Sequence, residues 1–323
     1  MRRLGCLVFL LIPACLVFAA VWFNTSWRGE GPLKEASTFT VRDGSSLTST
    51  AGRLEQAGAI RSARAFRIGA KLFGGAAVIK AGDYRIPAHA SASRILAILQ
   101  GGKTVPLLVP IPEGMPSILV QERLMANEDL TGDVAVPEEG SVLPDSYGYE
   151  KGESRAAVLA RMQAAMSQFM AEQWPKRDAT TPVKTQNEAL ALASIVEKET
   201  AIASERATVA GVYANRLRQG IMLQADPTII YPITKGKPLG RRILLSEKRA
   251  RNGYNTYAMP GLPKGPIANP GRATIIATLH PAQTSALYFV ADGKGGHVFA
   301  NTLAEHDANV KKWYAIRRSR GEM

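Results

Sequence analysis

Cysteine is scarce in this chain of 323 residues, and its placement excludes two kinds of chemistry. Cys6 and Cys15 are the only cysteines, and both lie in an apolar run near the N-terminus. The chain that follows this run therefore has neither a disulfide nor a thiol nucleophile. At roughly 300 residues it is long enough to bury its cores without covalent cross-links, and this length indicates about two domains.

The sequence also lacks the motifs of several common enzyme and metal sites. It contains no Gly-x-Ser-x-Gly, no P-loop, no dinucleotide fingerprint and no His-x-x-x-His or cysteine ligand set. His297, Glu305 and His306 come nearest to a metal site. A hairpin over residues 287–299, followed by a helix with a Thr302/Glu305 capping box, explains these residues more simply. We therefore predict no metal ion and no cofactor.

Residues 4–23 form an uncharged apolar run that follows Arg2 and Arg3. Twenty residues at 1.5 Å each match a hydrocarbon core about 30 Å thick. A cleaved signal peptide is the alternative, but its apolar stretch is about 7–15 residues long and ends at small residues, whereas this run ends at Trp22-Phe23. We predict an uncleaved single-pass helix in the cytoplasmic (inner) membrane, with the rest of the chain on the extracytoplasmic side.

Acidic side chains are outnumbered, since 40 Lys and Arg face 27 Asp and Glu for a formal net charge of +13. Such a charge indicates an acidic partner. Nucleic acid is poorly compatible with export, so we predict no nucleic-acid partner. Anionic lipid and an anionic wall polymer both fit the charge, which does not choose between them.

The pattern of residues predicts an α+β fold in three parts. Residues 1–37 comprise the cytoplasmic start, the membrane helix and a linker from residue 24 onward. Residues 38–108 form a small module that lacks any cluster of acid, histidine and nucleophile, which favours a binding or spacer role. Residues 109–323 form the second domain, in which residues 138–149 are expected to be a loop and residues 154–170 an amphipathic helix.

Thr185 and Glu188 fit a capping box that opens a helix running to about Thr200. With Leu192 at zero degrees and 100° per residue, Glu199 falls within roughly 60° of the apolar stripe. By the same count Glu197 and Lys198 lie about 120–140° away and should face solvent. The two glutamates of this helix are therefore not equivalent.

Burial on an apolar face and the negative end of the helix dipole should both raise the pKa of Glu199. A glutamate that stays protonated near neutral pH can act as a general acid toward a glycosidic oxygen. An ion pair with Arg206 or Arg216 explains a buried glutamate equally well. A second helix, capped by Ser204 and ended by Gly220, carries these arginines.

Polar side chains interleaved with tyrosines follow this helix, over residues 223–231, 254–257 and 261–271. Such a composition suits sugars, whose hydroxyls need hydrogen bonds and whose ring faces stack on aromatic rings. A proline-rich structural loop is the better-supported interpretation of this pattern alone.

Several ordered motifs resemble the YceG-like family of endolytic murein transglycosylases, and together they cover essentially the whole chain. They are Ala193-Ser194-Ile195-Val196-Glu197-Lys198-Glu199-Thr200, Leu223-Gln224-Ala225-Asp226-Pro227-Thr228, Tyr254-Asn255-Thr256-Tyr257, and residues 113–115, 143–147, 205, 215–217, 261–263, 288–291, 296–299 and 305–306. Lys264, where the family usually has a second proline, and Ser146, where threonine is commoner, are departures.

The resemblance implies a membrane helix, a LysM-like region and a C-terminal catalytic domain whose catalytic residue falls on Glu199. It implies a lytic transglycosylase that cuts between N-acetylmuramic acid (MurNAc) and N-acetylglucosamine (GlcNAc) in nascent glycan strands, leaves 1,6-anhydro-MurNAc ends and ends strand elongation. Its partners would be peptidoglycan strands, the membrane through residues 4–23, and peptidoglycan synthases. Candidates for holding the glycan are Gln224, Asp226, Tyr254 and Asn255.

Two other functions remain open at this stage. A glycoside hydrolase would use Asp226 as the second carboxylate that hydrolysis requires. A non-catalytic scaffold would use the LysM-like region to hold wall-assembly partners near the membrane.

Overall fold

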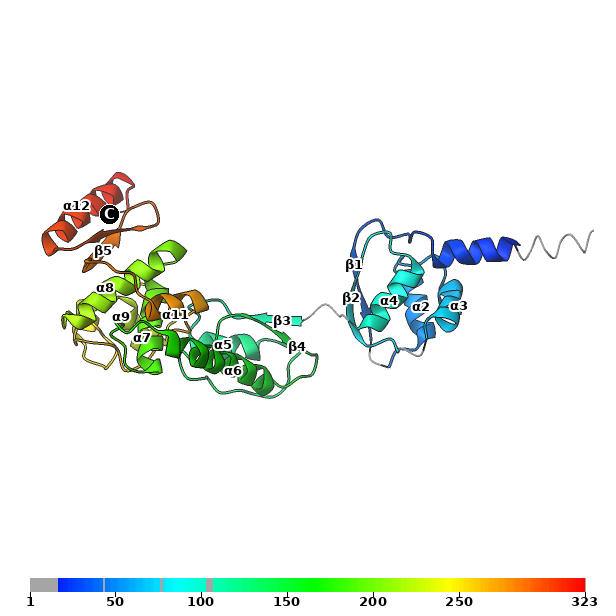
Figure 1. Cartoon of the computed structure of the whole chain (residues 1–323), viewed down its shortest axis with the longest axis horizontal. Helices are drawn as coiled ribbons and strands as arrows, with labels where there is room; N and C mark the ends of the chain where they lie inside the picture. The colour runs from blue at the N-terminus through cyan, green and yellow to red at the C-terminus, as the bar shows by residue number, and fades with distance from the viewer. Residues whose placement is uncertain (1–16, 43, 76–77, 103–106, 323) are drawn as a thin grey trace, which may run out of the picture. The chain divides into compact units, whose positions relative to one another are not determined.

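The computed structural model describes residues 17–42, 44–75, 78–102 and 107–322, and it mixes helices with short antiparallel sheets as predicted (Figure 1). The chain divides into two compact units, residues 1–106 and 107–323. The second unit begins with strand β3 (Leu107–Pro110), so the predicted boundary after residue 108 falls inside that strand.

Unit 1 is a two-stranded sheet covered by helices in the order β-α-α-β-α. Its elements are β1 (Ser37–Val41), α2 (Leu47–Gln56), α3 (Ala63–Phe73), β2 (Gly82–Ile86) and α4 (Ala92–Gly101). The strands pair antiparallel, with Phe39 opposite Tyr84. A serine side chain caps the start of each helix by accepting a backbone N–H from three residues on. The core of the unit is closed around Tyr84 and Phe66, which are fully buried.

A helix over residues 17–27 leads directly into unit 1, and this corrects the predicted linker at its start. Trp27 is only 4% exposed and packs on Phe66, with ring centroids 6.1 Å apart. Within the described part of the chain, we find no helix with the length and apolarity needed to cross a membrane. Residues 4–16 of the predicted span lie outside the described residues.

Unit 2 holds the second domain, and its regular secondary structure is mainly α-helical. After β3 come α5 (Ser117–Met125), β4 (Ser146–Tyr149), α6 (Arg155–Gln173), η1 (Trp174–Lys176), α7 (Gln186–Glu199), η2 (Ala203–Glu205), α8 (Arg206–Arg218), α9 (Pro227–Thr234), α10 (Leu245–Arg249), α11 (Arg272–Leu279), β5 (Tyr288–Ala291), β6 (His297–Ala300) and α12 (Leu303–Ser319). Strand β4 corrects the loop predicted there, since it pairs antiparallel with β3.

Helix α6 joins the two hydrophobic cores of unit 2. Its first turns bury Val158 and Met162 in the core beneath β3 and β4. Its last turns bury Met166 and Phe169 in the larger core, which α7, α8 and α11 build together. One long helix therefore holds the β3–β4 sheet against the helices that carry the candidate site.

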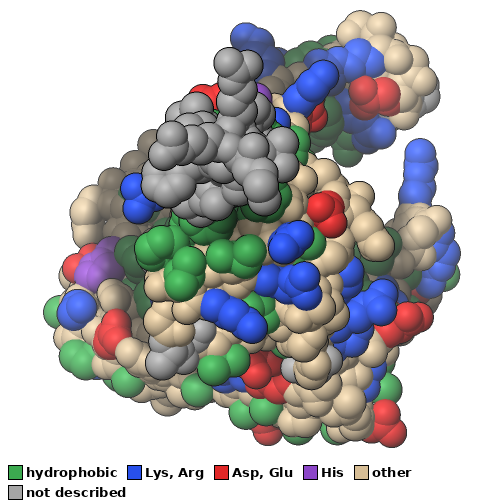
Figure 2. All heavy atoms as spheres, turned by 90° about the vertical axis from the view of Figure 1, so that its right-hand side faces the viewer, with side chains coloured by type: hydrophobic (Ala, Val, Ile, Leu, Met, Phe, Trp, Pro, Cys, Tyr) green, Lys and Arg blue, Asp and Glu red, His purple; other side chains and the backbone are tan. Residues whose placement is uncertain are grey.

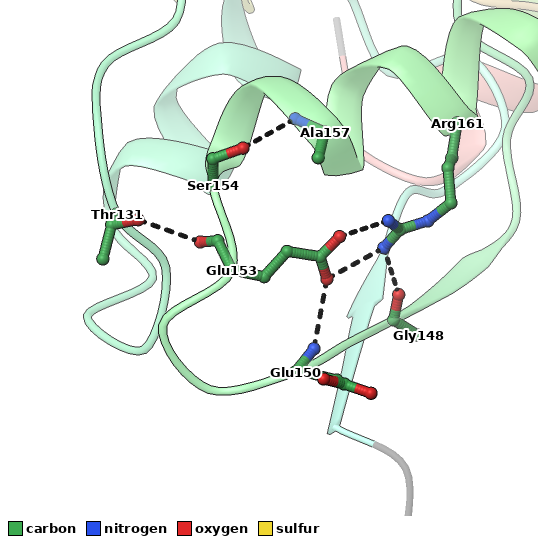
Figure 3. A network of polar contacts seen from close by, with 7 residues as sticks. All are labelled: Thr131, Gly148, Glu150, Glu153, Ser154, Ala157 and Arg161. Carbon is green, nitrogen blue, oxygen red and sulfur yellow. Dashed lines mark hydrogen bonds and ion pairs between the residues drawn. The ribbon is translucent and has the colours of Figure 1, made fainter.

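An arginine of α6 forms an ion pair with the preceding turn and a hydrogen bond with β4 (Figure 3). The Arg161 guanidinium binds both carboxylate oxygens of Glu153 and donates to the Gly148 carbonyl 2.6 Å away. Hydrogen bonding from Arg161 lowers the pKa of Glu153. Arg161 therefore links the helix both to the strand, through Gly148, and to the turn between them, through Glu153.

Candidate active site

Glu199 is the last residue of α7, where the apolar face of the helix reaches the surface of unit 2. Thr185 caps the start of α7 by accepting the N–H of Glu188 at 3.1 Å, as predicted. The reciprocal half of the capping box is displaced by one residue, because the Glu188 carboxylate accepts the backbone N–H of Lys184 and not that of Thr185. Leu192 and Val196, on the same face as Glu199, are at most 1% exposed.

The surroundings of the Glu199 carboxyl favour its protonated form. The residue is half-buried, and its Oε1 atom is out of contact with solvent and has no hydrogen-bond partner. Burial and, secondarily, the charge of Asp226 raise the pKa of Glu199 to about 7, although a hydrogen bond from Tyr213 and the charge of Arg216 oppose them. A carboxyl with this pKa can donate a proton and then hold the charge at neutral pH.

Helix α8 brings Tyr213 and Arg216 to the same place. Tyr213 is 2% exposed, and burial raises its pKa, with the nearby charge of Glu199 adding to the effect. The Arg216 guanidinium donates to the carbonyls of Leu287 at 2.6 Å and Leu223 at 2.9 Å. Arg216 therefore fixes the strand and loop around the site while its charge acts on Glu199.

No arginine forms an ion pair with Glu199 in the described ranges, so the alternative explanation of its burial is not supported. Arg206 instead pairs with Glu113, whose Oε2 lies 3.1 Å from the guanidinium. Arg216 directs its donors to backbone carbonyls.

Asp226 lies near Glu199 and is oriented by a residue that the sequence did not single out. The Tyr257 hydroxyl donates to Asp226 Oδ1 at 2.7 Å. The Lys248 ammonium lies 4.2 Å from the centre of the Tyr257 ring. Asp226 is exposed at the start of α9, so its carboxylate is fixed in orientation yet open to solvent.

Gln224 has a strained backbone and an exposed side chain. Its φ of 55° lies in the left-handed region, which non-glycine residues seldom adopt. Thr256 holds this conformation, because its carbonyl accepts the Gln224 N–H at 3.1 Å and its hydroxyl accepts the Ala225 N–H at 3.1 Å. Strain maintained in this way is characteristic of functional loops.

The structure gives Tyr254 and Asn255 supporting positions. Asn255 is fully buried and donates to three backbone carbonyls, while its side-chain oxygen accepts the Tyr257 N–H at 3.0 Å. Tyr254 packs on Tyr231, with ring centroids 4.8 Å apart, and the Lys264 ammonium lies 4.9 Å from its ring centre. Asn255 therefore shapes the loop that carries Tyr257, and its polar atoms are already engaged.

Lys198 is exposed as predicted, whereas Glu197 is half-buried and bonded to a neighbouring segment, which corrects the prediction for Glu197. Glu197 Oε2 accepts the N–H of Gly271 at 2.9 Å, at the start of α11. The Lys198 ammonium lies 3.4 Å from the Gly114 carbonyl. This side of α7 joins neighbouring segments, whereas the opposite side bears Glu199.

The residues around Glu199 could be found only in part from the sequence. The sequence indicates Arg216 as a possible partner of Glu199 and Tyr254 as a glycan contact, but it assigns no role to Tyr213 or to Tyr257. The repeated tyrosine in Tyr254-Asn255-Thr256-Tyr257 was the available signal, and the hydrogen bond from Tyr257 to Asp226 selects the second one.

Comparisons with known proteins identify the family. A model of the YceG-like family matches residues 39–312. The endolytic murein transglycosylase of Bacillus subtilis (strain 168) is 26% identical over an alignment of 325 residues, covering 90% of this chain and 89% of the relative. The endolytic murein transglycosylase of Streptococcus pneumoniae (strain D39) is 28% identical, covering 86% of this chain but only 58% of the longer relative.

A solved structure shares the fold. The crystal structure of a YceG-like protein from Listeria monocytogenes is 26% identical, with a TM-score of 0.53, and the match covers 85% of this chain and 99% of that one. The resemblance predicted from the motifs is therefore confirmed. Since the family match spans most of both units and includes Glu199 with its neighbours, the chain belongs to the YceG-like family.

Proposed function

We propose that this chain is a peptidoglycan lytic transglycosylase that cuts the bond between MurNAc and GlcNAc inside glycan strands. The observation that carries the proposal is the Glu199 carboxyl, whose Oε1 is unpartnered and whose pKa is raised to about 7. The curated relatives named endolytic murein transglycosylase support the same activity.

In the first step the Glu199 carboxyl donates its proton to the glycosidic oxygen, and the C1–O bond of MurNAc breaks. GlcNAc leaves with a free hydroxyl, and positive charge develops at C1 of MurNAc. In the second step the Glu199 carboxylate removes the proton from the C6 hydroxyl of the same MurNAc, and O6 bonds to C1. The product is a 1,6-anhydro-MurNAc end, and no water is consumed.

One carboxyl can serve both steps because its neighbours act in opposite directions. Burial and Asp226 favour the protonated form that begins the reaction. Tyr213 and Arg216 favour the carboxylate that exists between the two proton transfers. The internal C6 hydroxyl takes the place of water through proximity, so no second carboxylate is needed to activate a nucleophile.

We assign glycan binding to Gln224 and Asp226. Both side chains are exposed and lie on the loop that precedes α9, and the charge of Asp226 acts on Glu199. Tyr257 orients Asp226, and Thr256 holds the strained backbone of Gln224. Tyr254 and Asn255, which the sequence suggested as direct contacts, act in this proposal by shaping the loop between residues 252 and 257.

Hydrolysis is the second candidate, because the charge of Asp226 acts on Glu199. In that case Asp226 would be the second carboxylate of a glycoside hydrolase. The hydrogen bond from Tyr257 to Asp226 suits either role.

We further propose that residues 4–23 anchor the chain in the cytoplasmic membrane and that unit 1 is a LysM-like module. The order β-α-α-β at the start of unit 1 supports that assignment. With both units outside the membrane, the enzyme would meet nascent strands where peptidoglycan synthases extend them, and each cut would end the elongation of a strand.

Digestion of purified peptidoglycan, followed by mass analysis of the fragments, tests the proposal. We expect internal cuts that yield 1,6-anhydro-MurNAc ends. Ends that carry one added water as the dominant product would establish hydrolysis instead. Glu199→Gln should reduce cleavage by orders of magnitude, since it keeps the size of the side chain but removes the transferable proton.

Glu197→Gln is the matched control on the same helix turn. A glutamine oxygen can still accept the Gly271 N–H, so cleavage should stay near that of the unaltered protein. Greater damage from Glu197→Gln than from Glu199→Gln would reverse the assignment of the catalytic residue.

A further inference from the structure

Unit 1 has an exposed apolar surface next to the helix over residues 17–27. We call it the α3 face, and it consists of Ile68, Leu72 and Phe73. Two of these side chains are largely exposed, at 67% for Leu72 and 58% for Phe73. Ile68 and Leu72 lie one turn apart on the outer side of α3. Large apolar side chains that gather on one surface mark an interaction site.

The helix over residues 17–27 is held rigidly against α3. Gly69 allows this close approach, because a side chain there would overlap the Trp27 ring. Phe73 stacks on Trp27, with centroids 6.2 Å apart, and contacts Phe23 at 6.4 Å. The direction of the helix therefore fixes the orientation of the α3 face.

The position of Phe23 at the end of the proposed membrane span indicates how deep the α3 face lies in the bilayer. Phe23 is the last residue of the proposed membrane span, so its ring lies at the outer edge of the hydrocarbon core. Phe73 lies 6.4 Å from it, and the headgroup layer on each side of a bilayer is about 5–7 Å thick. An exposed Phe73 at this level would meet the boundary between acyl chains and headgroups.

Cationic side chains surround the α3 face in the pattern of an interfacial helix. Arg64 precedes Ile68 by one turn, and Lys71 adjoins Leu72; both are exposed. Figure 2 views unit 1 from the side on which the helix projects and shows hydrophobic side chains with Lys and Arg around them. An apolar centre with a basic rim matches a surface of anionic lipid.

We propose that the α3 face lies on the outer surface of the lipid bilayer, with Leu72 and Phe73 at the headgroup boundary. Arg64 and Lys71 then contact anionic headgroups. Unit 1 is thus docked on the membrane in a fixed orientation rather than tethered loosely above it. The inference rests on the proposed anchor over residues 4–23, and its test must separate the two.

The full chain reconstituted in nanodiscs with anionic lipid provides the test, since Cys6 and Cys15 are the only native cysteines. In a Cys6→Ser, Cys15→Ser background, an environment-sensitive dye is attached to Leu72→Cys or to the control Gln56→Cys. Gln56 is exposed at the end of α2. A third sample carries the dye on native Cys15, with Cys6→Ser, and reports insertion of the anchor.

Lipids that carry a shallow spin-label quencher give the readout at positions 56 and 72, and lipids with a quencher deep in the acyl chains give it at Cys15, which lies near the middle of the proposed span. We expect quenching at position 72 to exceed that at position 56 by at least about twofold, as for a helix lying in the interface. Equal quenching at positions 72 and 56, with Cys15 quenched, would overturn the docking while leaving the anchor intact. A blue-shifted but unquenched dye at position 72 would mean a protein cover and also overturn it. An unquenched Cys15 would remove the anchor itself.

Discussion

The environment that suits Glu199 for proton transfer should lower the stability of the folded protein above neutral pH. Its pKa is raised from 4.5 to about 7, so the folded chain keeps a proton that the unfolded chain releases between these values. Stability therefore falls as pH rises through this window. At about 1.4 kcal/mol per pKa unit, the loss above pH 7 is on the order of 3 kcal/mol.

Glu199→Gln should remove this pH dependence. At pH 8 we expect the variant to be more stable than the unaltered protein by about 1–3 kcal/mol, because a neutral amide replaces a buried charge. At pH 4 the glutamate is largely protonated in the folded and in the unfolded protein, so the advantage of the variant should disappear. Chemical denaturation at the two pH values measures the difference. An advantage of equal size at both would show that burial of the charge is not its cause.

Asp226→Asn tests the electrostatic link between Asp226 and Glu199. The substitution removes a negative charge that raises the pKa of Glu199 but leaves an oxygen to accept from Tyr257. The descending limb of kcat against pH should therefore move to lower pH. Saturating substrate keeps binding effects out of the profile. Loss of activity at every pH would instead favour hydrolysis with Asp226 as the second carboxylate.

Among elements, α7 was predictable and the loops around it were not. The cap at Thr185 and the apolar stripe through Val196 are local signals, and they placed Glu199 on the buried face. The bond between Tyr257 and Asp226 joins residues 31 positions apart, which no local pattern reveals. Strand β4 was missed because it is short and its partner β3 lies far upstream.

Helix α8 shows another limit of local patterns. Ser204 was predicted to cap it, but Ser204 lies inside the 3-10 turn Ala203–Glu205, and α8 begins at Arg206 without a side-chain cap. The end of α8 follows the prediction, since Gly220 takes a left-handed φ of 66°.

Asn269 joins three segments of unit 2, and its loss should destabilise the whole unit. It is fully buried, accepts the Val142 N–H at 3.0 Å and donates to the Met115 carbonyl at 2.9 Å. Asn269→Ala leaves the Val142 N–H buried without its partner, while the Met115 carbonyl keeps the backbone N–H of residue 269, and the change should cost about 1–3 kcal/mol. The exposed control Asn187→Ala should change the free energy of unfolding by less than about 0.5 kcal/mol. Equal effects in denaturant melts would mean that Asn269 is not a structural link.

At the scale of the whole molecule, the sequence predicted two folded parts after an apolar start. In the structure, residues 1–106 form one compact unit and residues 107–323 form the other. The sequence did not predict that the helix over residues 17–27 packs directly against the rest of unit 1. Trp27 was interpreted as part of a linker, because its partners Phe66 and Gly69 follow some forty residues later in the chain.

The packing of this helix against unit 1 bears on whether the apolar run is cleaved. Cleavage in the range of residues 24–30 would remove the helix over residues 17–27 in whole or in part. The site against Phe66 and Gly69, which Trp27 fills, would be left open or poorly covered. Since burying a large aromatic side chain contributes several kcal/mol, unit 1 would be less stable without this helix.

We therefore expect the mature protein to retain its apolar run. N-terminal sequencing should find Met1 or Arg2, and the protein should stay in the membrane fraction after alkaline carbonate extraction. A chain that starts at residue 17 should also unfold at a higher temperature than one that starts at residue 31, because only the longer chain contains Trp27. A mature N-terminus between residues 24 and 30 would identify the run as a signal peptide. Equal melting temperatures for the two truncated chains would show that the helix adds nothing to unit 1.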